Sequence, residues 1–324
     1  MVSREDADVR LACPDVGAEE AAAVADVLAT GQLTMGPKVQ EFEGELARAC
    51  GVEHVVALVG GRPVLVDIDA DSFNIDPELA AVAVGPRTKA IVPVHLFGRP
   101  ARLDDLPAVT VLEDAAGALG ARWQGRPCGG LGNAGCMSFH PRKIVTTGEG
   151  GAVTTNDPEL AERVRSYRHH GWSPSDRYDD MPSGAFNYRL SDILCAVGIP
   201  QVRRLEELLA RREEIAAGYR ERLSELPGVL LPSADRGDRH GWQAYVIQLD
   251  RRDEAMARLR ADGIQCQIGT YALHRLSAYR DQGRFPGADA CFERALALPL
   301  HSRLTETDLD RVAELLAAHM EGSS

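Results

Sequence analysis

Two predicted strands within residues 110–151 end in polar residues that could carry out chemistry. The first apolar run ends at Glu113 and Asp114, and the second, residues 136–139, is soon followed by Lys143. Because ligands of open α/β sheets bind at the carboxyl ends of the strands, we expect Asp114 and Lys143 to face one site. An acid and a lysine there suit pyridoxal 5'-phosphate (PLP). The lysine can form a Schiff base with the aldehyde, and the aspartate can keep the pyridine nitrogen protonated.

Spacing alone leaves other interpretations of these residues open. A lone lysine after a strand is usually a solvated surface residue, and a Glu-Asp pair in this position often caps a helix. A GxGxxG pattern also occurs at residues 130–135. It follows a Gly/Pro turn and leads into a predicted strand, whereas a dinucleotide fingerprint follows a strand and opens a helix. We therefore do not expect NAD binding. The spacing of the acid and the lysine does not by itself establish a PLP site, so the order of further motifs must distinguish between the interpretations.

That order resembles one protein family. VLEDAAGALGA at residues 111–121, SFHPRK at 138–143 and GEGG at 148–151 are similar to segments of the DegT/DnrJ/EryC1/StrS family of sugar aminotransferases. The resemblance extends from Gly31 to the predicted C-terminal helix. It implies that Lys143 is the Schiff-base lysine, that Asp114 binds the pyridine nitrogen and that Ser138 lies near the cofactor phosphate. Without the resemblance, Ser138 would be a strand hydroxyl bonded locally.

The resemblance also implies an activity and a second subunit. A related branch of the family carries His at the lysine position and performs dehydration, so Lys143 implies transamination. Asn187, in the segment FNYRLSD at residues 186–192, matches an asparagine that reaches the phosphate of the neighbouring subunit's cofactor in relatives. A homodimer with shared active sites follows from this match. The alternative is a helix-entry asparagine, with Ser191 or Asp192 as the helix cap.

The reaction and fold that the resemblance implies can be stated together. We expect PLP-dependent transfer of an amino group from glutamate or glutamine to a nucleotide-linked keto sugar, in amino-sugar, antibiotic or other secondary-metabolite biosynthesis. The expected fold class is α/β: a PLP-dependent aminotransferase-like large domain with a mostly parallel sheet, plus a smaller C-terminal α+β domain. The cofactor-binding domain would comprise residues 10–205, and the small domain residues 206–324, beginning with a long linking helix.

The sequence departs from the family at two places around the cofactor site. Only residues 60–62 separate the predicted strands at 54–59 and 63–69, where the family has a Ser-Gly-Thr turn, a helix, a further strand and an aromatic segment. In relatives that unit binds the phosphate at a helix N-terminus and stacks on the pyridine ring. Three residues cannot join parallel neighbouring strands, so these strands must pair differently or the chain is a shortened version. No stacking residue can be assigned.

The second departure is Gly117, where relatives carry Gln or His against the ring or its hydroxyl. Residues 101–107 are also too short for the crossover helix of relatives. An alternative function therefore stays open, in which the chain keeps the dimer, loses PLP affinity and serves as a non-catalytic partner or regulatory subunit of an active homologue.

Composition limits the partners. The 324 residues carry a net charge of −12 without basic runs, which argues against nucleic acid or an anionic membrane as the main partner. Small-molecule substrates, an amino donor and a keto sugar, are what the resemblance implies. No apolar stretch is long enough to span a bilayer, and the charged N-terminus lacks the apolar core of a signal peptide. The seven cysteines are scattered without a CxxC pair, so we expect reduced thiols, a cytoplasmic location and no metal site.

Regular elements must position these residues. Helical patterns occupy residues 19–28, 37–47, 78–84, 158–170, 203–226, 254–262, 289–295 and 306–319, and further strands are expected at 90–97, 152–156, 242–249 and 265–269. Asp76 and Asp157 each precede a proline and are predicted N-caps. His95 is expected to be a core or rim histidine rather than a catalytic one. His169 and His170 are adjacent on one helix and point apart, so they do not predict a metal pair.

Overall fold

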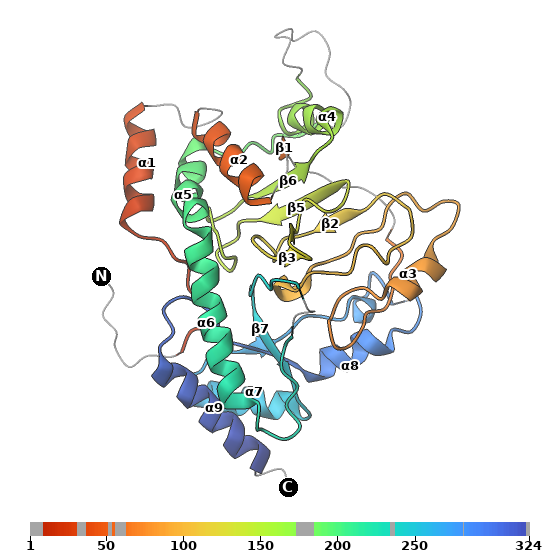
Figure 1. Ribbon diagram of the computed structural model, residues 1–324, viewed down its shortest axis with the longest axis vertical. Helices are drawn as coiled ribbons and strands as arrows, with labels where there is room; N and C mark the ends of the chain where they lie inside the picture. The colour runs from red at the N-terminus through yellow and green to blue at the C-terminus, as the bar shows by residue number, and fades with distance from the viewer. Residues whose placement is uncertain are drawn as a thin grey trace.

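The computed structural model describes residues 9–30, 37–50, 54–55, 63–172, 185–233, 237–280 and 282–321 (Figure 1). Its α-helices are α1 (Ala18–Thr30), α2 (Pro37–Cys50), α3 (Pro77–Ala83), α4 (Pro158–Arg168), α5 (Asp192–Arg203), α6 (Leu205–Leu223), α7 (Arg252–Ala261), α8 (Pro286–Arg294) and α9 (Glu306–Glu321). Short 3₁₀ helices cover Leu96–Gly98 and Leu273–Arg275. None of the described helices combines the length and the apolar composition that crossing a membrane requires.

The strands form two main sheets and one small hairpin. They are β1 (His54–Val55), β2 (Leu112–Asp114), β3 (Arg122–Trp123), β4 (Arg126–Pro127), β5 (Ala134–Ser138), β6 (Gly151–Thr155), β7 (Tyr245–Gln248), β8 (Gln267–Ile268) and β9 (Ala295–Leu298). The first sheet has the order β1-β6-β5-β2, the hairpin is β3-β4, and the second sheet has the order β7-β9-β8. Both pairs of the second sheet are antiparallel.

Parallel pairing is found in the part of the first sheet that carries the candidate site. β2 runs parallel to β5, with Asp114 opposite Cys136. The extended segment at residues 91–94 pairs in the same parallel sense with the chain around β2, through bridges between Ile91 and Val111 and between Val94 and Asp114. β6 is antiparallel to both β5 and β1. The expected α/β fold class is confirmed, with a sheet that mixes both kinds of pairing.

The strand expected at residues 63–69 is a misprediction. In that stretch Ile68 makes only an isolated antiparallel bridge with Ile75. Polar groups of this stretch bond to the C-terminal part of the chain instead: the N–H of Leu65 donates to the side chain of Gln282 at 2.8 Å, and the carboxylate of Asp67 accepts hydrogen bonds from the backbone N–H groups of Gly287 (2.8 Å) and Ala288 (2.9 Å). The segment is therefore bound to the first turn of α8 rather than to the first sheet. Of the strand expected at 54–59, residues 54–55 form β1, and the remainder lies outside the described residues.

Local sequence signals predicted several other elements correctly. The carboxylate of Asp76 caps α3 and that of Asp157 caps α4, each with a proline in the first turn. The long helix expected over residues 203–226 is α6, and α5 leads into it with a break at Arg204. The guanidinium of Arg204 donates to the buried carboxylate of Glu20 at 2.8 Å, which fixes the break against α1.

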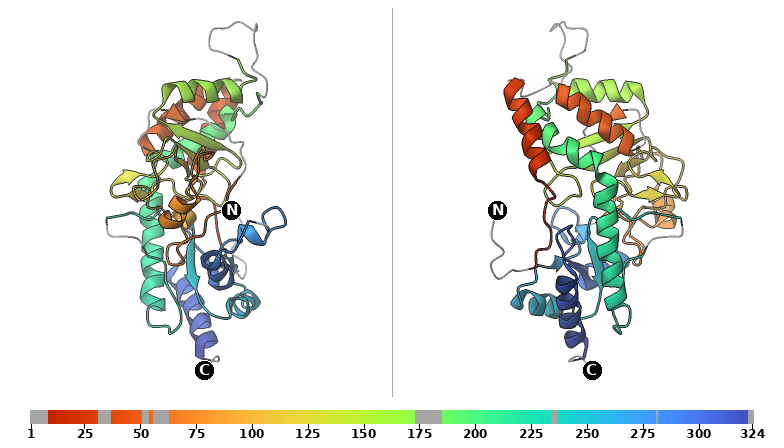
Figure 2. Two further views of the ribbon diagram at one scale, coloured as in Figure 1. Left: turned by 90° about the vertical axis from the view of Figure 1, so that its right-hand side faces the viewer. Right: turned by 60° about the vertical axis from the view of Figure 1, so that its left-hand side comes forward.

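Helix α6 packs against two hydrophobic cores, and Figures 1 and 2 show it running from the first sheet down to α9. Its first turns contribute Leu205, Leu208 and Leu209 to the core beneath the first sheet. Its later turns contribute Ile215 and Tyr219, among others, to the core of the second sheet. The helix therefore fixes how the two sheets lie relative to each other.

The contact between α2 and α5 depends on one glycine. Phe42 on α2 packs edge-to-face on Phe139, with ring centroids 5.1 Å apart, and both side chains are buried. A Cβ atom added at Gly198 on α5 would lie 2.4 Å from Cε2 of the Phe42 ring. Phe139 immediately follows β5, so this packing supports the strand that leads to Lys143.

We predict that Gly198→Ala destabilises the protein although alanine favours a helix. Alanine gains about 1 kcal/mol of helix propensity over glycine, but overpacking a close-packed core costs about 1–3 kcal/mol, and the new Cβ would overlap atoms of the Phe42 ring. The matched control is Gly44→Ala on α2, where the nearest atom to the new Cβ is the end of Arg48 at 3.9 Å. Urea unfolding should show lower stability for the first variant and unchanged or higher stability for the second. A stabilised Gly198→Ala variant would contradict this account of the packing.

Candidate active site

The two strand ends that were predicted to face one site lie side by side. Asp114 is the last residue of β2, Ser138 is the last residue of β5, and these two strands are parallel neighbours. Lys143 follows β5 in the next turn, where its backbone N–H donates to the carbonyl of His140 at 2.9 Å. The structure thus brings Asp114, Ser138 and Lys143 to one edge of the sheet, as the sequence indicated.

The loop that carries Lys143 is held by contacts with the first hydrophobic core and with α5. Ile144 and Val145 are buried in the first core. The buried carboxamide of Gln201 on α5 then brackets Thr146, accepting from its N–H at 3.0 Å and donating to its carbonyl at 2.8 Å. Gln201 was not identified from the sequence, since it acts through a contact between residues distant along the chain. The backbone on the C-terminal side of Lys143 is held by these contacts.

Lys143 lines a small cavity. The other lining residues come from three segments of the chain: Ala116, Gly117, Leu119, Ser138, Ile144, Val145 and Gln243. Of these, Gln243 was not predicted and belongs to the segment that precedes β7. No aromatic side chain lines this cavity within the described residues, so the structure identifies no ring-stacking residue either.

The electrostatic environment of Lys143 favours a reactive amine. Burial lowers the pKa of its ammonium below the ordinary lysine value. The carboxylate of Asp114 opposes this shift, and the guanidinium of Arg142 adds to it. The net lowering of the pKa leaves a larger neutral fraction of Lys143 near neutral pH than an exposed lysine would have. The contribution of Asp114 indicates that its carboxylate is close enough to interact electrostatically with the amine.

Glu113, the neighbour of Asp114, has a structural role. Its carboxylate is 1% exposed. It accepts hydrogen bonds from the backbone N–H groups of Gly129 (2.6 Å), Leu131 (2.7 Å) and Gly132 (2.7 Å). Adjacent strand residues point to opposite faces, so Glu113 binds the glycine-rich loop on one face while Asp114 faces the other. The GxGxxG-like segment is therefore a loop around a carboxylate that leads into β5, as expected from its flanks.

His95 completes this network. Its Nδ1 accepts from the N–H of Ala101 at 2.9 Å, so Nε2 carries the proton and donates to Glu113 at 2.9 Å. The side chain is buried. The expectation of a core histidine is confirmed, and the histidine connects the extended segment before it to the end of β2.

Asn187 lies elsewhere. It is exposed, pairs with His169 in an antiparallel bridge and is not among the residues lining the Lys143 cavity. The hydroxyl of Ser191 caps α5 by accepting from the N–H of Leu194 at 3.3 Å. The capping role considered for this segment thus belongs to Ser191, and the role of Asn187 toward a second subunit stays a prediction.

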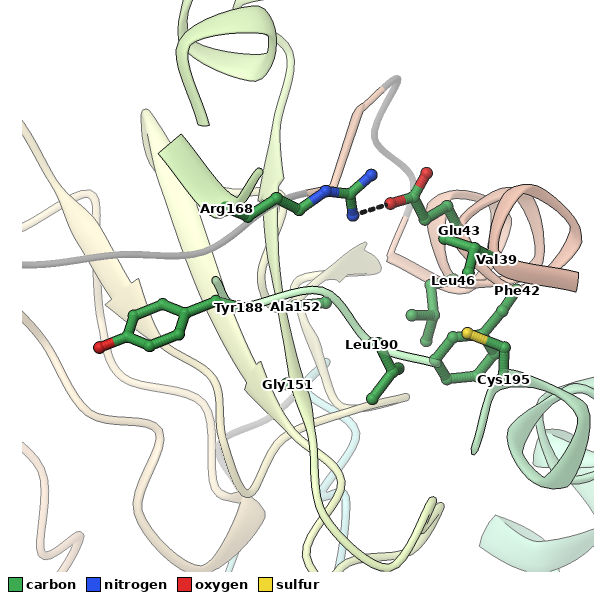
Figure 3. Close-up of a pocket in the computed structure, with 10 residues that line it drawn as sticks. All are labelled: Val39, Phe42, Glu43, Leu46, Gly151, Ala152, Arg168, Tyr188, Leu190 and Cys195. Atoms are coloured by element: carbon green, nitrogen blue, oxygen red, sulfur yellow. Dashed lines mark hydrogen bonds and ion pairs between the residues drawn. The ribbon is translucent and has the colours of Figure 1, made fainter. Parts of the chain in front are cut away.

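A second and larger cavity offers less chemistry. It is lined by Val39, Phe42, Glu43, Leu46, Gly151, Ala152, Arg168, Tyr188, Leu190 and Cys195 (Figure 3). Its two charged groups, Glu43 and Arg168, form an ion pair with each other. Burial raises the pKa of the Cys195 thiol to about 12, so this thiol is a poor nucleophile. The cavity at Lys143 is therefore the candidate active site. Among the described side chains, no group of three His, Cys, Asp or Glu residues could hold a metal ion.

The residues at Lys143 fit PLP in the part of the site that does chemistry. A half-buried amine with a lowered pKa suits covalent attachment, and Asp114 and Ser138 offer a carboxylate and a hydroxyl at the same sheet edge. The chain contains only three lysines, and of the other two Lys38 is paired with Glu41 and Lys89 is exposed. This scarcity was a signal in the sequence that already favoured Lys143.

Comparisons with known proteins show which family the chain resembles over most of its length. The model of the DegT/DnrJ/EryC1/StrS aminotransferase family matches residues 14–61 and 54–317. The chain is similar to the spore coat polysaccharide biosynthesis protein SpsC of Bacillus subtilis strain 168, with 32% identity over 388 positions that cover 100% of both chains. Among solved structures it is similar to the aminotransferase TlmJ from Streptoalloteichus hindustanus (31% identity, TM-score 0.90, 97% of this chain and 99% of that one). It is also similar to DesI in the presence of its TDP-sugar product (32% identity, TM-score 0.90, 98% of this chain and 94% of that one).

The same comparisons are consistent with the missing unit. The match to SpsC spans 388 positions, 64 more than the 324 residues of this chain, so at least 64 of its positions have no residue here. The two segments matched by the family model meet at residues 54–61. This is the place where the sequence lacks the turn, helix and strand expected from the family.

We predict that Glu113→Gln destabilises the protein by about 2 kcal/mol. The glutamine amide offers one acceptor oxygen where the carboxylate offers two, so at least one of the four donors around it loses its partner, and an unpaired buried donor costs about 1–3 kcal/mol. Glu207→Gln on the exposed side of α6 is the control. Urea unfolding measures both variants, and equal stability of Glu113→Gln and the native chain would show that the loop does not depend on the carboxylate.

Proposed function

The chain belongs to the DegT/DnrJ/EryC1/StrS aminotransferase family, and we propose that it uses PLP to transfer an amino group from glutamate or glutamine to a nucleotide-linked keto sugar. Aminotransferases of this family depend on PLP. The observation that carries the proposal is the environment of Lys143, a half-buried amine with a lowered pKa at the sheet edge that also carries Asp114.

Each residue of the site has a defined task in this proposal. When bound, PLP supplies an aldehyde and a protonated ring that withdraws electrons from the bond being broken. Lys143 would hold the cofactor covalently, and its Nζ, when free, would take the proton from the α-carbon of the donor and pass it to the cofactor. Asp114 would keep the ring nitrogen protonated through a charge-assisted hydrogen bond. The hydroxyl of Ser138 is available to the cofactor phosphate.

The names of the relatives support a sugar acceptor. DesI is described with a TDP-sugar product, and SpsC takes part in the biosynthesis of a spore coat polysaccharide. We propose a keto sugar carried on a nucleotide as the acceptor for this chain. The alternative, a non-catalytic partner subunit, would keep the fold without capturing PLP at Lys143, so cofactor capture separates the two functions.

We predict that PLP added to the native chain gives a visible absorption band, and that borohydride then fixes a covalent adduct on Lys143 that peptide mass mapping locates. With only three lysines in the chain, two variants test every lysine side chain. Lys143→Arg should lose the band and the adduct, and a Lys38→Arg, Lys89→Arg double variant should keep both. An adduct confined to Lys38 or Lys89, or no adduct in the native chain, would rule out the enzymatic function for this chain.

The same capture reaction should depend on pH in a defined direction. Because burial lowers the pKa of Lys143, the rate should rise with pH through a midpoint below the value of about 10.4 for an exposed lysine. The Asp114 carboxylate raises this pKa, so Asp114→Asn should move the midpoint to still lower pH. A midpoint that stays in place or moves up would contradict the electrostatic coupling of the two residues.

We further propose that the chain works as a homodimer in which Asn187 of one subunit reaches the cofactor phosphate of the other. The neighbours of Asn187 support an interface there. Phe186 and Tyr188 are 42% and 57% exposed, and their rings stack with centroids 4.9 Å apart. Two exposed aromatic rings flanking one polar residue are typical of a protein–protein contact.

For this proposal, light scattering should give a particle of about twice the chain mass of 35.0 kDa. Asn187→Ala should weaken PLP binding about three- to tenfold, the effect of one lost hydrogen bond, while the particle mass stays unchanged. Asn156→Ala, an exposed asparagine after β6, serves as the matched control. The shared site would be excluded if the native chain were a monomer, or if the Asn187→Ala variant bound PLP with native affinity.

A further inference from the structure

Gln243 reaches the candidate active site from a different part of the chain. Its segment precedes β7 and is bound to the region of Phe97 by backbone hydrogen bonds. Gly241 donates to the carbonyl of Gly98 at 2.8 Å, and Gln243 itself donates to the carbonyl of Phe97 at 3.0 Å. Gly98 has φ of +94°, and a Cβ atom there would lie 2.9 Å from the backbone nitrogen of Trp242. The backbones of these segments are therefore in direct contact, which fixes the position from which the Gln243 side chain extends.

The side chain of Gln243 occupies the space next to Gly117. A Cβ atom added at Gly117 would lie 3.4 Å from both Cγ and Oε1 of Gln243. Both residues line the cavity that contains Lys143 and Ser138. A long side chain at position 117 and the glutamine at position 243 would therefore compete for one volume, and in this chain the glutamine fills it.

Within the described residues, the carboxamide of Gln243 has no hydrogen-bond partner. Its oxygen and nitrogen make no hydrogen bond within the part of the chain that the structure describes. Ser138, Lys143 and Gln243 are the residues with polar side chains among the described residues that line the cavity. This half-buried amide offers two N–H donors and one acceptor oxygen to water or to a ligand in the cavity.

The backbones of the two contacting segments, at residues 97–98 and 241–243, are held in a strained conformation. Phe97 and Trp242 are non-glycine residues with φ of 58° and 46°, a region that side-chain-bearing residues rarely adopt. The N–H of Trp242 donates to Nδ1 of the buried His240 at 2.8 Å. Burial lowers the pKa of His240 to about 3, so this ring stays neutral and keeps accepting. Strain maintained by such contacts is characteristic of functional sites.

We propose that Gln243 is a cofactor-binding residue whose carboxamide hydrogen-bonds a polar atom of the PLP ring system, taking the place that a polar side chain at position 117 would otherwise have. The inference rests on the proposed function, because it requires PLP at Lys143. It adds a residue from the segment before β7 to a site otherwise built on the first sheet.

The test measures PLP dissociation constants by absorbance titration of the full-length chain. Gln243→Leu keeps the packing volume and removes the amide, so we expect an affinity three- to tenfold lower than that of the native chain. The matched control is Gln265→Leu, an exposed glutamine that does not line the cavity, and it should bind as the native chain does. Melting curves without PLP should coincide for Gln243→Leu and the native chain, which separates a binding effect from unfolding.

A relocation variant makes the test stricter. Gly117→Gln combined with Gln243→Ala moves the amide to the other wall of the same volume. The backbone φ of Gly117 lies outside the left-handed region, so this position accommodates a side chain without backbone strain. This double variant should bind PLP more tightly than Gln243→Ala alone. Native affinity in Gln243→Leu would overturn the inference and leave the proposed function intact. Failure of the native chain to bind PLP would overturn both.

Discussion

The carboxylate of Glu113 is the interaction on which the candidate site depends. It accepts from three backbone N–H groups of the glycine-rich loop and from His95, whose other ring nitrogen accepts from Ala101. One buried charge thus joins the extended segment before residue 101, the end of β2 and the loop that leads into β5. Removing a charge of this kind leaves several donors unpaired at once, which is why such networks are either complete or strongly destabilising. Asp114 is the next residue along β2, so its position follows from that of Glu113.

A second constraint fixes the lysine and brings the two sheets together at the cavity. Gln201 on α5 brackets Thr146 in the lysine loop, and α6 continues from α5 into the core of the second sheet. The same pair of helices therefore supports the loop that carries Lys143 and packs on the second sheet, which the segment of Gln243 precedes. The site is a property of the packing between distant parts of the chain, and no single segment contains it.

This arrangement explains which features could be predicted from the sequence. The placement of Asp114 and Lys143 at one edge follows from local rules, because apolar runs mark the strand ends and parallel neighbours bring those ends together, whereas Ser138 was assigned through the family resemblance. Gln201 and Gln243 obey no local rule, since each acts through a contact between segments distant in sequence. The strand expected at residues 63–69 failed for a related reason: its apolar residues fit a strand, but the carboxylate of Asp67 binds the start of α8 instead.

The family resemblance implies that the unit absent near residues 60–62 would bind the cofactor phosphate, and we expect the loss of those phosphate contacts to lower cofactor affinity more than it affects chemistry. Contacts to the phosphate of a cofactor are made equally before and during bond breaking, so they contribute uniform binding and leave the rate of the chemical step unchanged. The reactive groups are different: the neutral fraction of Lys143 is set by its burial, by the charge of Asp114 and by Arg142, all of which lie in the described part of the chain. A chain trimmed in this way is therefore expected to hold PLP more weakly than its relatives while keeping an amine of the right reactivity. When PLP is bound weakly, each additional contact to its ring contributes a larger share of the remaining affinity. The amide of Gln243 would therefore matter more in this chain than in a relative with the full set of phosphate contacts.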